Sequence, residues 1–295
     1  MVTDRILWLS DTRLDQWISD PEERAIIGDT QLRWAQSIAR PTTELVFEEV
    51  ERNSARRFTP WYLHPRAVLA GEIVERVRQA EEDGYDAAFP GMCYGEFFLK
   101  AARQAVKMPV VGPAESSMLL AQTLGAKFAV VTAIDDEGFV PIMEENIRAR
   151  GYESRAIRNE PVRYIMPQLL RLMLDAFAGR PERLIEEFEE QALKSVRDGA
   201  DVVICGCNPY GAALSYVGYN EVANTGVPVV TPLPAMIKAA ESLIDLRRSL
   251  GWTKSESLRS PYRSTAPDVL ADLTSRGLLT PVIPRHMGDR LVAGV

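Results

Sequence analysis

The chain has 295 residues, of which 46% are hydrophobic, and a formal net charge of −7. A chain of this size can bury one large core or two moderate ones. Its acidic balance lacks the basic surface of a nucleic-acid-binding protein, and no apolar run approaches the roughly 20 residues that span a bilayer. Its three cysteines, an odd number, argue against a disulfide framework and favour reduced thiols in the cytoplasm. We therefore expect a cytoplasmic protein that binds neither nucleic acid nor membrane.

The first part of the chain alternates short apolar runs with helical patterns, and Gly125 closes its last helix in the way expected of a helix C-terminus. The expected elements are, in chain order, a strand at 6–9, a strand around Val46, a helix from Pro65 or Arg66 to Glu82, a strand at 86–89, a helix at 96–106, a strand at 109–111 and a helix at 115–124.

The second part repeats this alternation, which predicts parallel sheets joined by right-handed crossovers. The expected elements are a strand at 127–132, a helix at 139–150, a weak strand at 154–157, a helix at 181–198, a strand at 201–205, a strand at 228–230 and a helix at 234–250.

We predict an α/β fold of two Rossmann-like (flavodoxin-like) parallel-sheet lobes related by a pseudo-twofold, with the active site in the cleft between them. The first lobe is expected over 1–125, and the second over 126–233. The helix 234–250 is expected to return to the first lobe. The remaining residues, 251–295, form an extension with a helix beginning near Pro267, for which covering the cleft and making a subunit contact are both open roles.

One short pattern occurs twice. The first copy, GYDAAFPGMCYGEFF, begins at Gly84, and the second, GADVVICGCNPYGAA, begins at Gly199. Each has Gly-x-Asp, a strand-like run, a cysteine, a small or polar turn and a helical stretch, and each is followed by Pro-Val-Val and a proline. Cys93 and Cys207 occupy equivalent places in the two copies, so the duplication predicts a site with one thiol on each side.

Both cysteines come directly after a strand and before a helix, and ligands of open parallel sheets bind at this edge. The positive end of a helix dipole there stabilises a thiolate, and Pro209 suits the first turn of the helix after Cys207. Two thiols facing one cleft suit stereoinversion at a carbon acid. One thiolate removes a proton from one face, and the opposing thiol delivers a proton to the other.

At GMCYGE and ICGCNPYGAAL the chain resembles the Asp/Glu/hydantoin racemase superfamily. GAKFAVVT, PVVGPAES and PVVTPLPAMIKAAESL resemble further family segments, and the resemblance covers about residues 6–250. The chain looks closest to the hydantoin racemase branch, because Glu115 follows PVVGPA as an acid does there. The resemblance implies a cofactor-independent racemase or epimerase, without a metal, that uses Cys93 and Cys207 as acid/base residues.

The chain departs from the branch pattern at three turns. Residues 95–97 are Gly-Glu-Phe, where an aspartate and a proline are usual in the branch. Residues 208–210 are Asn-Pro-Tyr, where smaller residues are common. Residues 10–12 are Ser-Asp-Thr rather than the usual Asn-Pro-Asn. These positions line the family's substrate pocket, so the substrate is left open. The residues expected to bind substrate are Ser10, Asp11, Thr12, His64, Tyr94, Gly95, Thr132, Asn208, Pro209 and Tyr210.

Several of these residues have a plainer interpretation. The hydroxyl and carboxyl groups of residues 10–12 also suit the cap of a following helix, and His64 also suits a structural role in a loop. Cys205 lies inside a strand and is expected to be a small buried hydrophobe. A metal site from Cys205 and Cys207 would need a second Cys/His cluster with ligand spacing, which the sequence lacks.

We therefore predict racemisation or epimerisation of a small carbonyl-bearing carbon acid, such as a hydantoin-like ring or an amino acid derivative, by a homo-oligomer. The alternatives on the same fold are an arylmalonate-type decarboxylase and a maleate-type cis–trans isomerase. A two-lobed small-molecule binding protein is an alternative of another class. A nucleotide cofactor is not expected, because no G-x-G-x-x-G follows a strand, and GCNPYG lacks the Lys-Ser/Thr of a phosphate loop.

Overall fold

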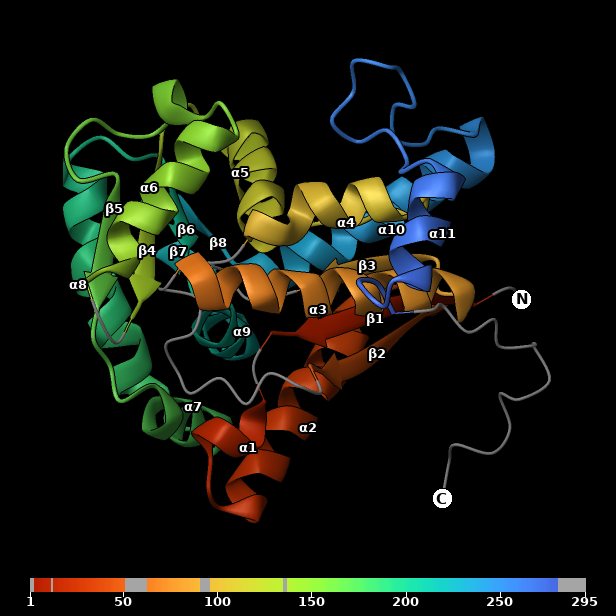
Figure 1. Ribbon diagram of the computed structural model, residues 1–295. Helices are drawn as coiled ribbons and strands as arrows, with labels where there is room; N and C mark the ends of the chain where they lie inside the picture. Colours follow the sequence, from red (N-terminus) through yellow and green to blue (C-terminus); the bar gives the residue numbers. More distant parts are fainter. Residues whose placement is uncertain (1–2, 12, 51–62, 91–95, 135–136, 281–295) are drawn as a thin grey trace.

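The computed structural model describes residues 3–11, 13–50, 63–90, 96–134 and 137–280 (Figure 1). Two parallel sheets lie side by side, each covered by helices, so the predicted α/β fold of two parallel-sheet lobes is confirmed. None of the helices in these described ranges is long and apolar enough to cross a membrane.

The first sheet has the strand order β2-β1-β3, with β1 (Asp4–Ser10) pairing in parallel with both β2 (Thr43–Glu49) and β3 (Ala87–Pro90). A single parallel bridge from Ala88 to Val110 continues it. Its helical segments are α1 (Leu14–Trp17), α2 (Pro21–Ile38), α3 (Leu63–Glu82), the 3₁₀ helix η2 (Glu96–Phe98) and α4 (Leu99–Ala105).

The second sheet has the order β5-β4-β6-β8-β7. Its strands are β4 (Phe128–Ala133), β5 (Val162–Ile165), β6 (Val202–Cys205), the short antiparallel β7 (Glu221–Val222) and β8 (Val227–Val230). Its helical segments are α6 (Phe139–Ala149), η3 (Glu153–Arg155), α7 (Leu169–Phe177), α8 (Glu182–Arg197) and α9 (Asn208–Tyr216).

A helix at the end of each half crosses to the other lobe. Although α5 (Pro113–Leu124) precedes residue 125, its Met118 packs in the core of the second sheet with Phe128. Conversely, α10 (Pro232–Leu250) packs against the first sheet, where Met236 shares a core with Trp8. The two helices also contact each other. Each lobe therefore contributes a helix to the core of its neighbour, and this exchange fixes the lobes against one another.

Charged groups anchor α10 at the end of the first sheet where β1 begins. The buried Glu241 carboxylate accepts hydrogen bonds from the Arg40 N–H (2.7 Å) and from the Thr43 hydroxyl (2.9 Å). The buried carboxylate of Asp4 forms ion pairs with Arg40 and with Arg248 of α10.

The structure corrects the prediction for the outer strand of the second sheet. Residues 154–157 form no strand, only the 3₁₀ helix η3 and one bridge at Ala156, whereas β5 lies at Val162–Ile165. The charged Arg163 interrupts the apolar pattern of β5. Its side chain is nevertheless largely buried, because it pairs with Asp198 and Glu160.

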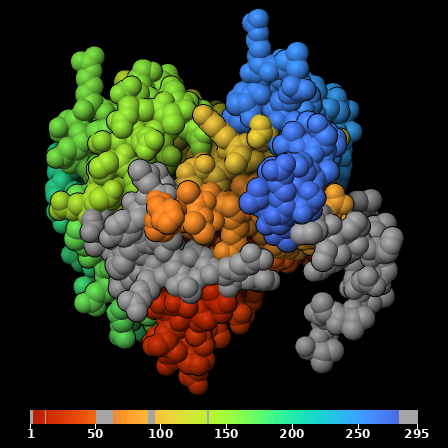
Figure 2. Space-filling view, viewed as in Figure 1, coloured from red at the N-terminus to blue at the C-terminus, as the bar shows by residue number. Residues whose placement is uncertain are grey.

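Residues 251–280 lie over the first lobe, beside the orange surface of α3 in Figure 2. Lys254 Nζ donates to the carbonyl oxygen of Gln104 (2.8 Å), and the Arg103 guanidinium lies 5.6 Å from the centre of the Tyr262 ring. The helix expected near Pro267 is α11 (Pro267–Ser275).

Candidate active site

Cys207 lies at the point where the second sheet feeds into α9. It is the N-terminal cap residue of α9, with an extended backbone, and its carbonyl oxygen accepts from the Gly211 N–H (2.8 Å). The thiol is buried, with an exposed fraction of 2%. Pro209 stands in the first helical turn, as predicted. The N-terminal end of a helix favours negative charge, so this position suits a thiolate.

Close backbone packing brings Cys207 beside β4. The Gly206 N–H donates to the carbonyl oxygen of Val131 (2.8 Å), and a Cβ at Gly206 would lie only 2.8 Å from Thr132 Cβ. No side chain therefore fits at residue 206 without displacing a neighbour. Thr132, which is fully buried, lies next to the turn that carries the thiol.

Cys205 is a thiol of a different kind. It is fully buried at the end of β6, and its Sγ lies 3.5 Å from the carbonyl oxygen of Cys207. Burial raises the pKa of the Cys205 thiol well above its ordinary value. Cys205 therefore stays protonated at neutral pH, which fits the predicted packing role.

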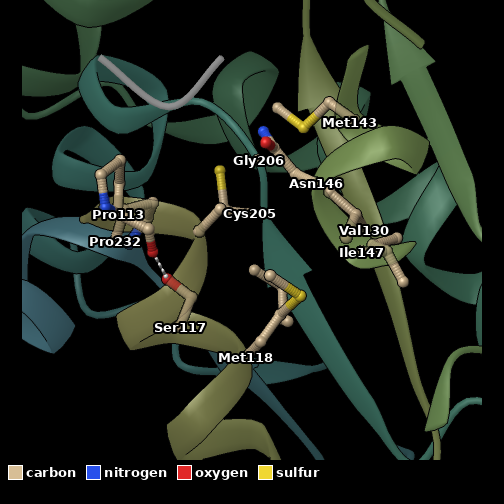
Figure 3. Close-up of a pocket in the computed structure, with 12 residues that line it drawn as sticks. Pro113, Ser117, Met118, Val130, Met143, Asn146, Ile147, Cys205, Gly206 and Pro232 are labelled. Atoms are coloured by element: carbon tan, nitrogen blue, oxygen red, sulfur yellow. Dashed lines mark hydrogen bonds between the residues drawn. The ribbon is translucent and has the colours of Figure 1, made fainter. Parts of the chain in front are cut away.

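A small pocket lies beside this turn (Figure 3). It is formed by α5, by α6 and by the strands β4 and β6, and none of its described lining residues carries a charge. Ser117 satisfies its hydroxyl by donating to the carbonyl oxygen of Pro113 (2.7 Å). The lining residues are Pro113, Ala114, Ser117, Met118, Val130, Met143, Asn146, Ile147, Ile204, Cys205, Gly206 and Pro232.

The first lobe contributes the end of β1. Ser10 is the last residue of β1, and Asp11 follows it as a buried residue. The described residues do not show the predicted capping of the next helix. The Leu14 N–H at the start of α1 donates instead to the Glu49 carboxylate (2.8 Å), and the cap residue Arg13 makes no side-chain cap.

Two of the predicted substrate-binding residues occupy unexpected positions. The Tyr210 ring is fully buried against Phe188, and its hydroxyl donates to the carbonyl oxygen of Leu184. This placement in the core does not support a role in binding substrate. His64 lies in the first turn of α3 rather than in a loop, with an exposed side chain. Asn208, in contrast, is buried at the start of α9 directly after Cys207.

Four predicted site residues, namely Thr12, Cys93, Tyr94 and Gly95, lie outside the described residues. Within the described ranges no group of three or more His, Cys, Asp or Glu side chains is arranged to hold a metal ion.

The sequence interpretation missed a buried ion pair at this end of the molecule. Glu96, in η2, pairs with Arg150 at the C-terminal end of α6 (2.7 Å). Burial raises the pKa of the Glu96 carboxyl, whereas the Arg150 guanidinium and the backbone N–H of Glu115 act to lower it. The sequence marked Glu96 only as a departure from a family pattern. Nothing in the sequence points to its partner, which lies 54 residues away.

Comparisons with known proteins fit this geometry. The family described as Asp/Glu/Hydantoin racemase matches residues 32–241. A hydantoin racemase from Pseudomonas sp. (strain NS671) is 32% identical over 224 residues, which cover 75% of this chain and 82% of that protein.

Two solved structures share the fold. An allantoin racemase from Klebsiella pneumoniae superposes with a TM-score of 0.67 at 21% identity, over 90% of this chain and 94% of that one. An allantoin racemase from Pseudomonas fluorescens superposes with a TM-score of 0.63 at 26% identity, over 89% of this chain and 97% of that one.

Proposed function

The chain belongs to the Asp/Glu/hydantoin racemase family, and from this premise we propose that it inverts a carbon stereocentre by proton transfer between Cys93 and Cys207. The enzyme is an isomerase of the racemase type. Its substrate is a small carbon acid whose carbonyl group acidifies the proton on the stereocentre. Neither metal nor organic cofactor takes part in the proposed reaction.

The observation that carries this proposal is the position of Cys207. The residue follows a buried parallel strand, caps a helix and stands beside Thr132 at the edge of the sheet where ligands bind. Cys93 has the equivalent place in the other copy of the repeated pattern. In one direction Cys207, as a thiolate stabilised by α9, removes the proton, and the Cys93 thiol protonates the opposite face of the resulting enolate. In the other direction the two roles are exchanged.

We further propose a hydantoin-like ring with an uncharged substituent as the substrate class. The name of the Pseudomonas sp. relative supports the ring, and the pocket supports the uncharged substituent, because its described lining residues carry no charge. Gly206 lines this pocket and directly precedes Cys207. The thioethers of Met118 and Met143 can adapt to substituents of different shape.

Proton exchange tests the function directly. Either enantiomer of a 5-substituted hydantoin, incubated with the enzyme in heavy water, should take up deuterium at C5 while its optical rotation decays to zero, with no other change in its composition. Activity that is abolished by a chelator and restored by zinc would contradict the cofactor-free mechanism. Carbon dioxide release from a disubstituted malonate, conversion of maleate to fumarate, or ligand binding without turnover would each replace the proposed reaction.

Enlarging a side chain tests the pocket. Met143→Phe should lower kcat/KM for a hydantoin with a 5-isobutyl group by about 10-fold or more relative to 5-methylhydantoin, because the ring fills space that the longer substituent needs. Met166, a methionine that is 55% exposed, supplies the matched control Met166→Phe, which should leave this ratio unchanged. An unchanged ratio in Met143→Phe would remove the pocket from the substrate site.

A further inference from the structure

Glu96 follows Cys93 by three residues, and three donors hold its carboxylate. Oε2 accepts from Arg150 Nε (2.9 Å) and Nη2 (2.7 Å), and Oε1 accepts from the Glu115 N–H (2.8 Å). The Glu96 side chain is completely shielded from solvent, and the Arg150 side chain is 8% exposed. Hydrogen bonds between charged groups in such surroundings are short and directional, so they define the position of the carboxylate closely.

The start of α5 is built around this carboxylate. Its cap residue, Gly112, has no side chain to accept the free N–H groups of the first turn. Glu96 performs this function from another part of the chain, by accepting the Glu115 N–H. A Cβ at Gly112 would lie 2.4 Å from Glu96 Oε1, so any side chain there would displace the carboxylate.

The ion pair also joins the two lobes. Glu96 belongs to the first lobe and follows Cys93 by three residues in the sequence, whereas Arg150 ends α6 of the second lobe. Met143 and Ile147 of α6 line the pocket beside the Cys207 turn. One carboxylate therefore connects the chain that leaves Cys93 with a helix that forms the surroundings of Cys207.

A purely stabilising role explains this arrangement poorly. Taking two charges out of water costs free energy that their attraction only roughly offsets, and apolar residues of similar size often stabilise as well or better. What a buried pair provides that an apolar contact does not is a defined geometry at both ends.

We propose that Glu96 is a positioning residue for the first catalytic thiol. By binding both Arg150 and the start of α5, it fixes the chain three residues after Cys93 relative to the second lobe. This role rests on the proposed two-thiol function. It predicts that damage to the ion pair impairs proton transfer at one face of the substrate far more than at the other.

The experiment measures deuterium uptake from each enantiomer of a 5-substituted hydantoin separately. Cys93→Ser and Cys207→Ser first identify the enantiomer whose proton each thiol removes. In Glu96→Gln, uptake from the enantiomer that depends on Cys93 should fall about 10- to 100-fold, because small misplacements of a reacting group cost rates of that order. Uptake from the enantiomer that depends on Cys207 should change by less than about 3-fold.

Two further variants complete the test. Arg150→Lys keeps the charge but loses the planar fork, so it should show the same asymmetry, and it replaces Glu96→Gln as the deciding variant if the latter does not fold. Glu115→Gln is the matched control, because its side chain pairs with Arg103 (2.7 Å) while its backbone N–H still binds Glu96. This control should change uptake from both enantiomers by less than about 3-fold.

The possible results separate the two proposals. Equal losses for both enantiomers in folded Glu96→Gln, or no loss in either, would overturn the positioning role. Wild-type uptake from both enantiomers in Cys93→Ser would instead overturn the two-thiol function. A Cys93→Ser variant with one-sided loss, reproduced more weakly by Glu96→Gln and Arg150→Lys, supports both.

Discussion

A helical segment follows each of two strands, η2 after β3 and α9 after β6, but different forces hold the two segments. After β3, the Glu96 carboxylate is bound by Arg150 and by the start of α5. After β6, the segment is held mainly by packing: the Tyr210 ring stacks on Phe188, and the tyrosine hydroxyl donates to the carbonyl oxygen of Leu184.

The difference shows that a duplicated topology does not require duplicated interactions. Most buried residues of α9 lie in the apolar core of the second sheet, so packing is the main force that holds the segment. The η2 segment meets the other lobe and the start of α5, where free N–H groups need an acceptor. The Glu96 carboxylate supplies that acceptor. Its hydrogen bonds are directional, which suits a segment that contacts both lobes.

The largest effect is expected at the thiols, because the proposed reaction needs the two halves of the molecule to act alike there. Cys207→Ser puts a far weaker acid at one face, so racemisation should fall by about three orders of magnitude or more in both directions. Chiral chromatography of the reaction mixture measures this loss. Cys205→Ser, the control two residues away, changes a thiol that lines the pocket but transfers no proton in the proposed reaction, so it should cost some stability and far less activity than Cys207→Ser. If Cys205→Ser were the inactive variant, the second thiol would be misassigned.

The packing that holds the second half can be tested at Tyr210. Tyr210→Ala should cost about 3–5 kcal/mol of unfolding free energy through the cavity that it leaves, and Tyr210→Phe about 1 kcal/mol through the lost hydrogen bond. Urea unfolding measures both. Tyr216→Phe, at a tyrosine that is 41% exposed, is the control and should stay within about 0.5 kcal/mol of the wild type. A Tyr210→Ala cost below about 1 kcal/mol would contradict the role of packing.

The close contact beneath the Cys207 turn predicts a smaller effect. Gly206→Ala forces a Cβ to within 2.8 Å of Thr132 and Val130 side-chain atoms, so it should destabilise by about 1–3 kcal/mol and lower kcat. Gly211→Ala, whose nearest contact would be 3.0 Å, should cost less on both measures. Thermal unfolding and initial rates compare the variants. Equal behaviour of the two would show that the turn tolerates movement.

Sequence patterns predicted most strands and helices and the position of Cys207, because apolar runs and strand-to-helix turns are local signals. They did not predict β5, since the buried charge of Arg163 is compensated by Asp198, 35 residues away. They did not predict the burial of Tyr210, because α9 is buried on nearly every side and no polar face shows which of its residues point into the core. The Glu96–Arg150 pair was not predicted for the same reason as β5, because the sequence around a charged residue does not identify a partner that is distant in the chain.

The charged environment of the first lobe gives the smallest predicted effect, at Tyr85. Its hydroxyl donates to Glu48 Oε1 (3.1 Å) and the Arg5 guanidinium lies 4.4 Å from its ring centre. Burial raises the pKa of Tyr85 to about 12, and the Glu48 carboxylate adds to the rise. Because the pKa is higher in the folded state than the ordinary value near 10, the stability linked to Tyr85 is complete below about pH 10 and is lost between about pH 10 and 12.

Tyr85→Phe has no such titration, so its unfolding free energy should fall less than that of the wild type over this range. The full shift would correspond to at most about 2.7 kcal/mol, and solvent screening near the surface of the lobe reduces the expected difference to roughly 1 kcal/mol. Urea unfolding of both proteins at pH 9, 10 and 11, with reductant to protect the thiols, measures it. The deprotonation of lysines is common to both proteins and cancels in the difference. A difference that stays constant with pH would show that Tyr85 ionises in the folded state as readily as in the unfolded chain. Burial and the Glu48 carboxylate would then not raise its pKa.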